Sequence, residues 1–156
     1  MPSIFSKLLL GLAVIVGSGF SADNSLGTWK LDLAKSKYTP APPPVKSLNV
    51  TREEADGGVK VTTTGEQTDG TAISATYTAK FDAKEVPVSG NAPYDMIAVK
   101  QSNANTFTDE RRKSGGQYKA TGRTMISNGG KTMTTTIRGT NSEGKPFTAV
   151  LVFDKQ

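Results

Sequence analysis

This chain of 156 residues lacks several of the residue types on which enzyme chemistry depends, and that excludes most reaction classes. Histidine and cysteine are both absent, which removes Ser-His-Asp and Cys-His nucleophiles, thiol redox chemistry, disulfides and nearly all zinc, haem and iron–sulfur sites. The adjacent acids Glu53-Glu54 and Asp109-Glu110 lie in predicted strands, where neighbouring side chains point to opposite faces. Neither pair can converge on one substrate, and we expect no catalytic residue.

The sequence also lacks the short motifs that bind phosphate or metal. No GxSxG, phosphate-binding loop or metal-ligand cluster is present, and the Asp and Asn residues of the turns lack the dense spacing of a calcium loop. We therefore predict a non-catalytic protein without metal or cofactor. Acid/base catalysis by carboxylates from different strands remains the open alternative.

Charge gives no indication of a nucleic-acid partner. The formal net charge is +5, and the lysines and arginines are scattered. The single basic run, Arg111 to Lys113, follows two acids and is typical of a solvated strand end or loop. We predict no nucleic-acid binding.

The first residues have the layout of an export signal. Lys7 supplies positive charge, Leu8–Val16 is apolar, and small residues follow up to Ala22. The apolar run is too short to span a bilayer, which needs about 20 residues. We place cleavage after Ser21, so that 1–21 is a signal peptide and 22–156 is an exported periplasmic or extracellular domain without a membrane span. Cleavage lowers the net charge by one.

The rest of the chain is typical of a single all-β domain. Short stretches rich in Val, Ile, Thr, Tyr and Phe are separated by turn sequences. They predict strands over Gly27–Leu33, Val45–Glu54, Val59–Gly65, Ala72–Asp82, Asp95–Gln101, Thr106–Lys113, Gln117–Ser127, Lys131–Gly139 and Phe147–Asp154, with Glu85–Val88 as a further short candidate. Residues 34–44 form a proline-rich connector, for which we expect an extended polyproline segment.

The connections are short, which favours an antiparallel meander. Along each predicted strand, apolar or small residues alternate with polar ones. Such a pattern fits an up-and-down barrel of about eight to ten strands, with a two-sheet sandwich as the alternative.

One hairpin can be placed in register. Asn128-Gly129 favours a two-residue type I′ turn, which would pair Ser127 with Gly130 and Ala120 with Ile137. One face then carries Tyr118, Ala120, Gly122, Thr124, Met133, Thr135 and Ile137. The other face carries threonines together with Lys119, Arg123 and Arg138.

The motif GTWKL (Gly27–Leu31), at the start of a meander that ends in LVFDKQ, resembles the calycin superfamily of lipocalins and fatty-acid-binding proteins. The whole mature chain is more similar to a group of uncharacterised exported lipocalin-like proteins of soil bacteria. That similarity extends to PVSGN (Pro87–Asn91) and the GTN turn (Gly139–Asn141). The resemblance implies that Trp29 closes the base of the barrel, often against an arginine from a late strand, yet the hairpin register puts Arg123 and Arg138 outside.

Two departures from fatty-acid-binding proteins are evident. Those proteins have a helix-turn-helix lid between the first two strands, and the proline-rich connector is too short for it. They also bind the carboxylate with an Arg-x-Tyr motif in the last strands, where this chain has Leu151-Val152-Phe153. The fatty-acid-binding mode of that family is therefore not expected here.

The predicted interior mixes large and small side chains, so it is either a pocket or a filled core. For the pocket, our candidate ligand-binding residues are Tyr77, Phe107, Tyr118, Thr124, Met133, Thr135 and Leu151. The chain would then be a monomeric binder of a small apolar or amphipathic molecule. The alternative is a protein-interaction or inhibitor module with a filled barrel, which would use the loop Asn91–Asp95 and exposed Tyr38 and Tyr94.

Overall fold

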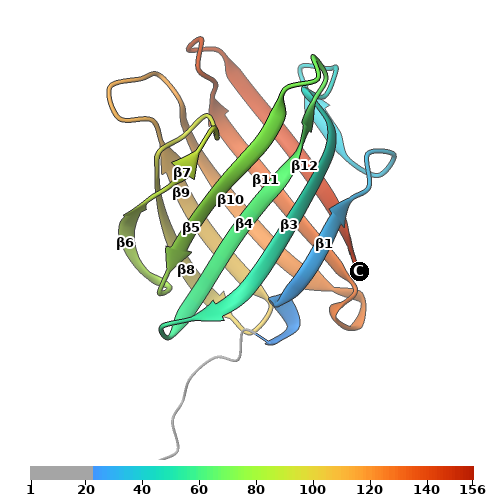
Figure 1. The fold of residues 1–156 in the computed structure, drawn as a ribbon, viewed down its shortest axis with the longest axis vertical. Coiled ribbons are helices and arrows are strands. Elements are labelled where there is room, and N and C mark those ends of the chain that lie inside the picture. Colours follow the sequence, from blue (N-terminus) through green and yellow to red (C-terminus); the bar gives the residue numbers. More distant parts are fainter. Residues whose placement is uncertain (1–22) are drawn as a thin grey trace, which may run out of the picture.

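The computed structural model describes residues 23–156, and the predicted signal peptide lies outside them. The described chain is a strongly tilted antiparallel β-structure with two short 3-10 turns (Figure 1). The elements are η1 (Asp23–Ser25), β1 (Gly27–Leu31), β2 (Lys37–Thr39), β3 (Val45–Ala55), β4 (Gly58–Gln67), β5 (Ala72–Ala79), β6 (Asp82–Pro87), β7 (Ser89–Gly90), β8 (Met96–Asn103), β9 (Thr106–Arg112), β10 (Lys119–Ser127), η2 (Asn128–Gly130), β11 (Thr132–Thr140) and β12 (Pro146–Lys155). Within residues 23–156, no helix has the length and apolar character needed to cross a membrane.

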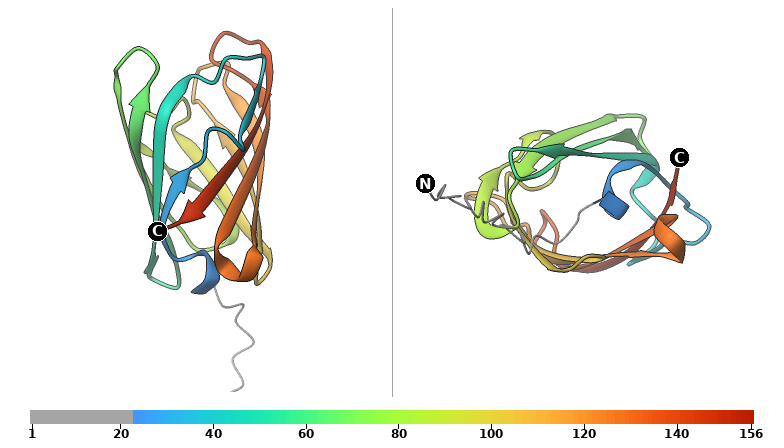
Figure 2. Two further views of the ribbon diagram at one scale, coloured as in Figure 1. Left: turned by 90° about the vertical axis from the view of Figure 1, so that its right-hand side faces the viewer. Right: turned by 90° about the horizontal axis from the view of Figure 1, so that it is seen from below.

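The strands form one sheet that curls into a nearly closed barrel. Its order is β6-β8-β9-β10-β11-β12-β1-β3-β4-β5-β7, and β2 adds to the edge of β12. The first strand joins both ends of the meander, because β1 pairs with β3 on one side and with β12 on the other. The two ends of this order, β6 and β7, are consecutive in the chain, and the barrel is oval when seen along its axis (Figure 2). These findings confirm an all-β antiparallel barrel that is nearly closed, and they correct the expected number of strands, since the sheet has 12 strands rather than eight to ten.

Most predicted strands are present, and the proline-rich connector holds the main difference. β1 ends at Leu31, and Leu33 is exposed rather than part of a strand. The expected polyproline segment is interrupted by β2, which pairs with Thr148–Val150 of β12. Ser36 connects the chain to β12 just before β2 begins. Its hydroxyl donates to the carbonyl of Asp32 at 2.7 Å and accepts from the backbone N–H of Val152 at 3.0 Å. The free upper edge of β12 therefore acquires a partner where β1 stops.

The hairpin between β10 and β11 has the predicted faces but not the predicted register. Ser127 pairs with Thr132 instead of Gly130, and Ala120 pairs with Gly139 instead of Ile137. The turn is longer because three consecutive residues from Asn128 onward, the last two glycines, all adopt positive φ, so a two-residue turn does not form. Since the shift is two residues and the side-chain period of a strand is two, each inward side chain stays inward.

Trp29 is completely buried at the end of the barrel that η1 covers. Its indole N–H donates to the carbonyl of Ser25 at 2.9 Å. The cation over its ring is the Nζ atom of Lys155, 5.3 Å from the ring centroid. Arg123 and Arg138 are exposed on the outside, as the hairpin faces predicted. The arginine partner that the resemblance implied for Trp29 is therefore replaced by a lysine from the last strand.

We expect Trp29→Ala to lower the free energy of unfolding by about 3–5 kcal/mol, because the loss of a fully buried indole leaves a cavity. Met125→Ala is the matched control, since Met125 is a large apolar side chain that is 43% exposed; it should change stability by less than about 0.5 kcal/mol. Urea unfolding of both variants measures the difference. Equal effects would show that Trp29 does not hold this end together.

Candidate ligand cavity

A cavity of about 540 Å³ opens at the end of the barrel opposite Trp29. Its rim is formed by residues of the connector from Tyr38 to Pro44, the loop 91–94, Gln67 at the end of β4, and Asn141 and Ser142 in the turn after β11. Its walls carry small or aliphatic side chains, among them Ala75, Ile137 and Ala149. The proline-rich connector therefore lies at the mouth of the barrel, and no helical lid is present among the described residues there.

The structure brings the sequence-predicted site residues to the barrel interior at two levels. Tyr118 lines the cavity. The other six are not in its lining and lie in the interior below it or beside it: Tyr77, Phe107, Thr124, Met133, Thr135 and Leu151. Among these, the hydroxyl groups of Thr124 and Thr135 form a buried hydrogen bond of 2.9 Å. A ligand contact for any of the seven stays a prediction.

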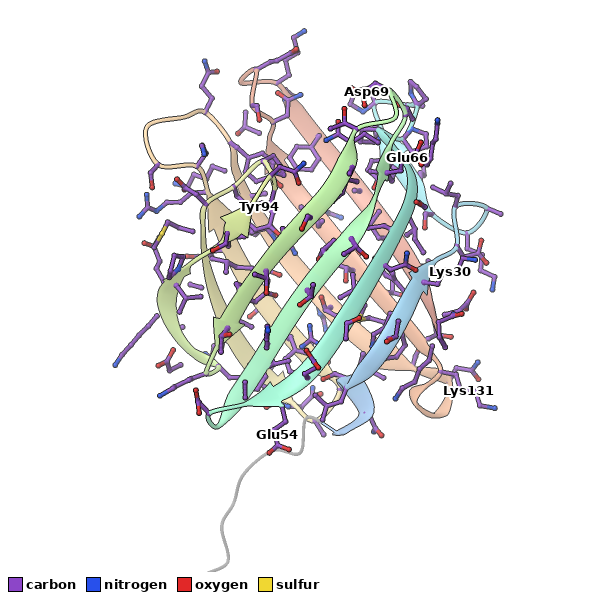
Figure 3. The ribbon with its side chains drawn as sticks, viewed as in Figure 1. Lys30, Glu54, Glu66, Asp69, Tyr94 and Lys131 are labelled. Atoms are coloured by element: carbon purple, nitrogen blue, oxygen red, sulfur yellow. The ribbon has the colours of Figure 1, made fainter. Side chains whose placement is uncertain are left out.

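An aromatic cluster forms one side of the mouth. Tyr94 stacks on Tyr118 with ring centroids 5.7 Å apart, and Tyr118 contacts Phe147 at the same centroid distance. Tyr94 lies in the upper part of the barrel (Figure 3). Our expectation that Tyr38 and Tyr94 are exposed is wrong, because both are partly buried and line the cavity. The loop that carries Tyr94 turns inward, where its ring finds apolar partners. Burial raises the pKa of Tyr38 and of Tyr118 to about 12.

A buried ion pair lies in the barrel interior beside the cavity. Arg111 donates from Nε and Nη2 to the two carboxylate oxygens of Asp109, at 2.6 and 3.0 Å. The two side chains are 13% and 9% exposed. Burial is the largest single influence and lowers the pKa of Arg111, but Asp109 together with Tyr94 and Tyr118 outweighs it and holds that pKa well above its usual value. Arg111 lines the cavity, and its Cζ lies 5.2 Å from the centroid of the Tyr94 ring.

The ion pair corrects our interpretation of the basic run as a solvated strand end. Arg112 does point outward, to Glu85, but Arg111 shares the inward parity of Phe107 and Asp109 on β9. The pair fits because the facing residue on β10 is Gly122, where a Cβ would overlap the carboxylate of Asp109.

A second inward arginine lies deeper. Arg52 of β3 is only 7% exposed, and its Cζ lies 5.0 Å from the centroid of the Phe107 ring. Its Nε and Nη2 have no hydrogen-bond partner among the described residues. Burial lowers the pKa of Arg52, while Tyr77 and Asp109 oppose that shift. Sequence reasoning missed this residue, although its spacing from the apolar Val50 indicates an inward position.

The two motifs of the sequence resemblance beyond the Trp strand are found at the cavity mouth. In PVSGN, Asn91 accepts a hydrogen bond from the N–H of Ser74 at 2.9 Å and donates to the carbonyl of Ala72 at 2.7 Å, so its amide extends the ladder of β5. Gly90 has φ of 103°, and a Cβ there would overlap the carbonyl of Ser74. In GTN, the Oδ1 of Asn141 accepts from two backbone N–H groups of its own turn. Both asparagines line the cavity.

No protein-family model matches this chain, and no curated protein matches it either. Solved structures, in contrast, match this chain. Lipocalin 12 from rat epididymis is 14% identical, with a TM-score of 0.51 over 88% of this chain and 69% of that protein. Zebrafish ileal bile acid-binding protein, solved in complex with cholic acid, is 12% identical, with a TM-score of 0.50 over 85% of this chain and 99% of that protein.

At such identities the likeness shows the fold alone. The chain shares the antiparallel barrel fold of lipocalin 12 and of the bile acid-binding protein, which agrees with the fold that the calycin resemblance implied. The closer similarity to one bacterial group stays a prediction.

Burial raises the pKa of Tyr38, Tyr77 and Tyr118 from 10.0 to about 12 in the folded protein. Because the folded state holds these phenols neutral, their contribution to stability is complete below pH 10 and is lost as the pH rises from 10 toward 12. Absorbance of phenolate against pH should show three late titrations, and Tyr77→Phe should remove one of them. Titration of all the tyrosines near pH 10 in the folded protein would contradict the buried positions.

Asn91→Asp tests the side-chain extension of β5. The substitution keeps the acceptor but removes the amide donor to Ala72, and because Asn91 is exposed we expect a loss of about 0.5–1.5 kcal/mol of stability. Asn103→Asp is the control, because Asn103 uses only its acceptor, toward the N–H of Asn105; it should lose less than about 0.5 kcal/mol. Urea unfolding compares the two, and similar losses would refute a special role for Asn91.

Proposed function

We propose that this protein is an exported, non-catalytic carrier that takes a small apolar or amphipathic molecule into the cavity at the open end of its barrel. The observation that carries the proposal is the cavity itself. Its volume of about 540 Å³ falls in the range of small-ligand sites, which are typically about 300–1,000 Å³. A barrel filled by its own side chains, as the interaction module would require, leaves no such space.

The lining supports a ligand with a large apolar part. Aromatic, aliphatic, proline and alanine residues make up most of the lining, and the polar groups include Arg111, Gln67 and the two asparagines. Ligand sites typically combine an apolar lining with a few polar groups that orient the ligand. The fold is shared with a protein solved in complex with cholic acid, which supports the same class of function. Tyr118 would contact the ligand directly, and the six other predicted residues would support it from the barrel interior.

Export as a monomer is part of the proposal. The export part rests on the predicted signal peptide 1–21, and the monomeric state is the expectation from the sequence. Native mass spectrometry of the protein purified from its own host would identify the ligand class: an adduct of a few hundred daltons, released on denaturation, is the expected result.

A cavity-filling substitution tests the site with a neutral dye, N-phenyl-1-naphthylamine. Ala92 lines the cavity in the loop after β7, so Ala92→Trp should weaken binding of the dye by at least about tenfold. Ala104→Trp is the control, because Ala104 lies in the turn between β8 and β9, outside the cavity lining. Each variant adds one indole, which keeps their fluorescence comparable. Binding unaffected by Ala92→Trp, or absent from the wild type, would refute the carrier.

A further inference from the structure

The charged groups of the barrel interior do not balance. Three charged side chains of the described residues are exposed by 13% or less: Arg52, Arg111 and Asp109. Two guanidinium groups therefore face one carboxylate. Asp109 gives both of its oxygens to Arg111, so the excess positive charge resides on Arg52.

The donors that lack partners gather around one ring. Arg52, a residue of β3, lies against the ring of Phe107, a residue of β9. Two of its guanidinium nitrogens have no hydrogen-bond partner among the described residues. The cross-strand neighbour of Phe107 is Gln101, whose buried Nε2 also has no partner among the described residues. All of these groups are donors. The group that would complete them must accept hydrogen bonds.

Charge decides which acceptor fits. A buried charge without a counter-charge is costly in a protein interior. A neutral acceptor would complete the hydrogen bonds but leave the charge uncompensated, whereas an anion does both and forms stronger, charge-assisted hydrogen bonds. The other groups that interact with Arg52 are the Tyr77 hydroxyl and Asp109, and Asp109 is already paired.

Arg52 lies close beneath the cavity. Arg52 pairs with Val61 on β4, and the next inward residue of β4 toward the mouth is Thr63, which lines the cavity. Two residues of a strand span about 6.5–7 Å. Arg52 therefore lies one layer of side chains below the cavity.

From this arrangement we propose that the barrel interior contains an anion-binding site, in which the guanidinium of Arg52 and the amide of Gln101 bind an anionic group. The anion is either a small free ion or the acidic group of a molecule held in the cavity. The site differs in its strand positions from an Arg-x-Tyr clamp in the last strands. The free-ion form is independent of the carrier function, and the acidic-ligand form rests on it.

Bromide tests the site in the wild-type protein. In crystals grown with sodium bromide, anomalous scattering should give a peak within hydrogen-bond distance of Nε or Nη2 of Arg52. Arg123 is an internal comparison, because its guanidinium is exposed on the outer face. A peak at Arg52 supports the free-ion form.

A matched pair of fluorescent molecules tests the acidic-ligand form. Pyrenebutyric acid and pyrenebutanol differ only in the head group, and we expect the wild type to prefer the acid by at least about tenfold. Arg52→Met, which exchanges the charge for a flexible apolar side chain, should remove most of that preference. Arg123→Gln should keep it. The melting temperature of each variant confirms that it is folded.

The outcomes separate this proposal from the carrier function. Absence of bromide at Arg52, together with an acid preference that is missing or unchanged by Arg52→Met, overturns the anion site. The anion site is also overturned if the preference for the acid is lost only in an Arg111 variant, because that result would place the acidic group in the cavity, beside Arg111. If pyrenebutanol binds in these cases, the carrier function stands. If bromide binds Arg52 but neither pyrene compound binds, the anion site stands and the carrier function fails.

Discussion

The barrel depends on β1, which joins the two ends of the meander. Five residues suffice because each side of the strand finds a partner: Trp29 lies opposite Val50 of β3 and opposite Lys155 of β12. The indole fills the interior at the level where these three strands meet, and its N–H is bound by Ser25. The indole thereby closes this end of the barrel, and its N–H has a hydrogen-bond acceptor. The cavity lies at the other end.

The distribution of side-chain size along the barrel axis explains why one end is hollow. Large inward residues, including Phe107, Met133 and Phe153, pack with Trp29 in one buried cluster. Near the mouth, one inward position on each of four strands is small, namely Ala75 of β5, Ala120 of β10, Gly139 of β11 and Ala149 of β12, beside the larger Ile73, Ile137 and Phe147. Small side chains at these positions leave space at this end, whereas larger ones there would fill the barrel. The space is therefore built into the sequence.

Much of the fold could be predicted from the sequence because it follows from a period of two. Alternation placed the inward faces of β10 and β11 correctly even though the turn length was wrong, since a shift of two residues preserves the face. The same rule, applied to charged residues, would have placed Arg52 and Arg111 inside. They were missed because charged side chains are ordinarily exposed, and because the partner of Arg111, Asp109, is recognisable only once Gly122 is known to lie opposite.

The cavity could not be predicted, because its rim comes from segments without periodicity. The inward turn of the Tyr94 loop depends on Asn91, whose side-chain amide takes the place of a backbone group beside β5. The motifs that carry the family resemblance, PVSGN and GTN, fix backbone positions at the mouth through Gly90, Gly139 and their asparagines. The guanidinium groups and all of the aromatic rings that would meet a ligand lie outside PVSGN and GTN. Closure of the barrel and recognition of a ligand therefore rest largely on different residues, so a chain can keep this barrel and its mouth while the chemistry inside changes.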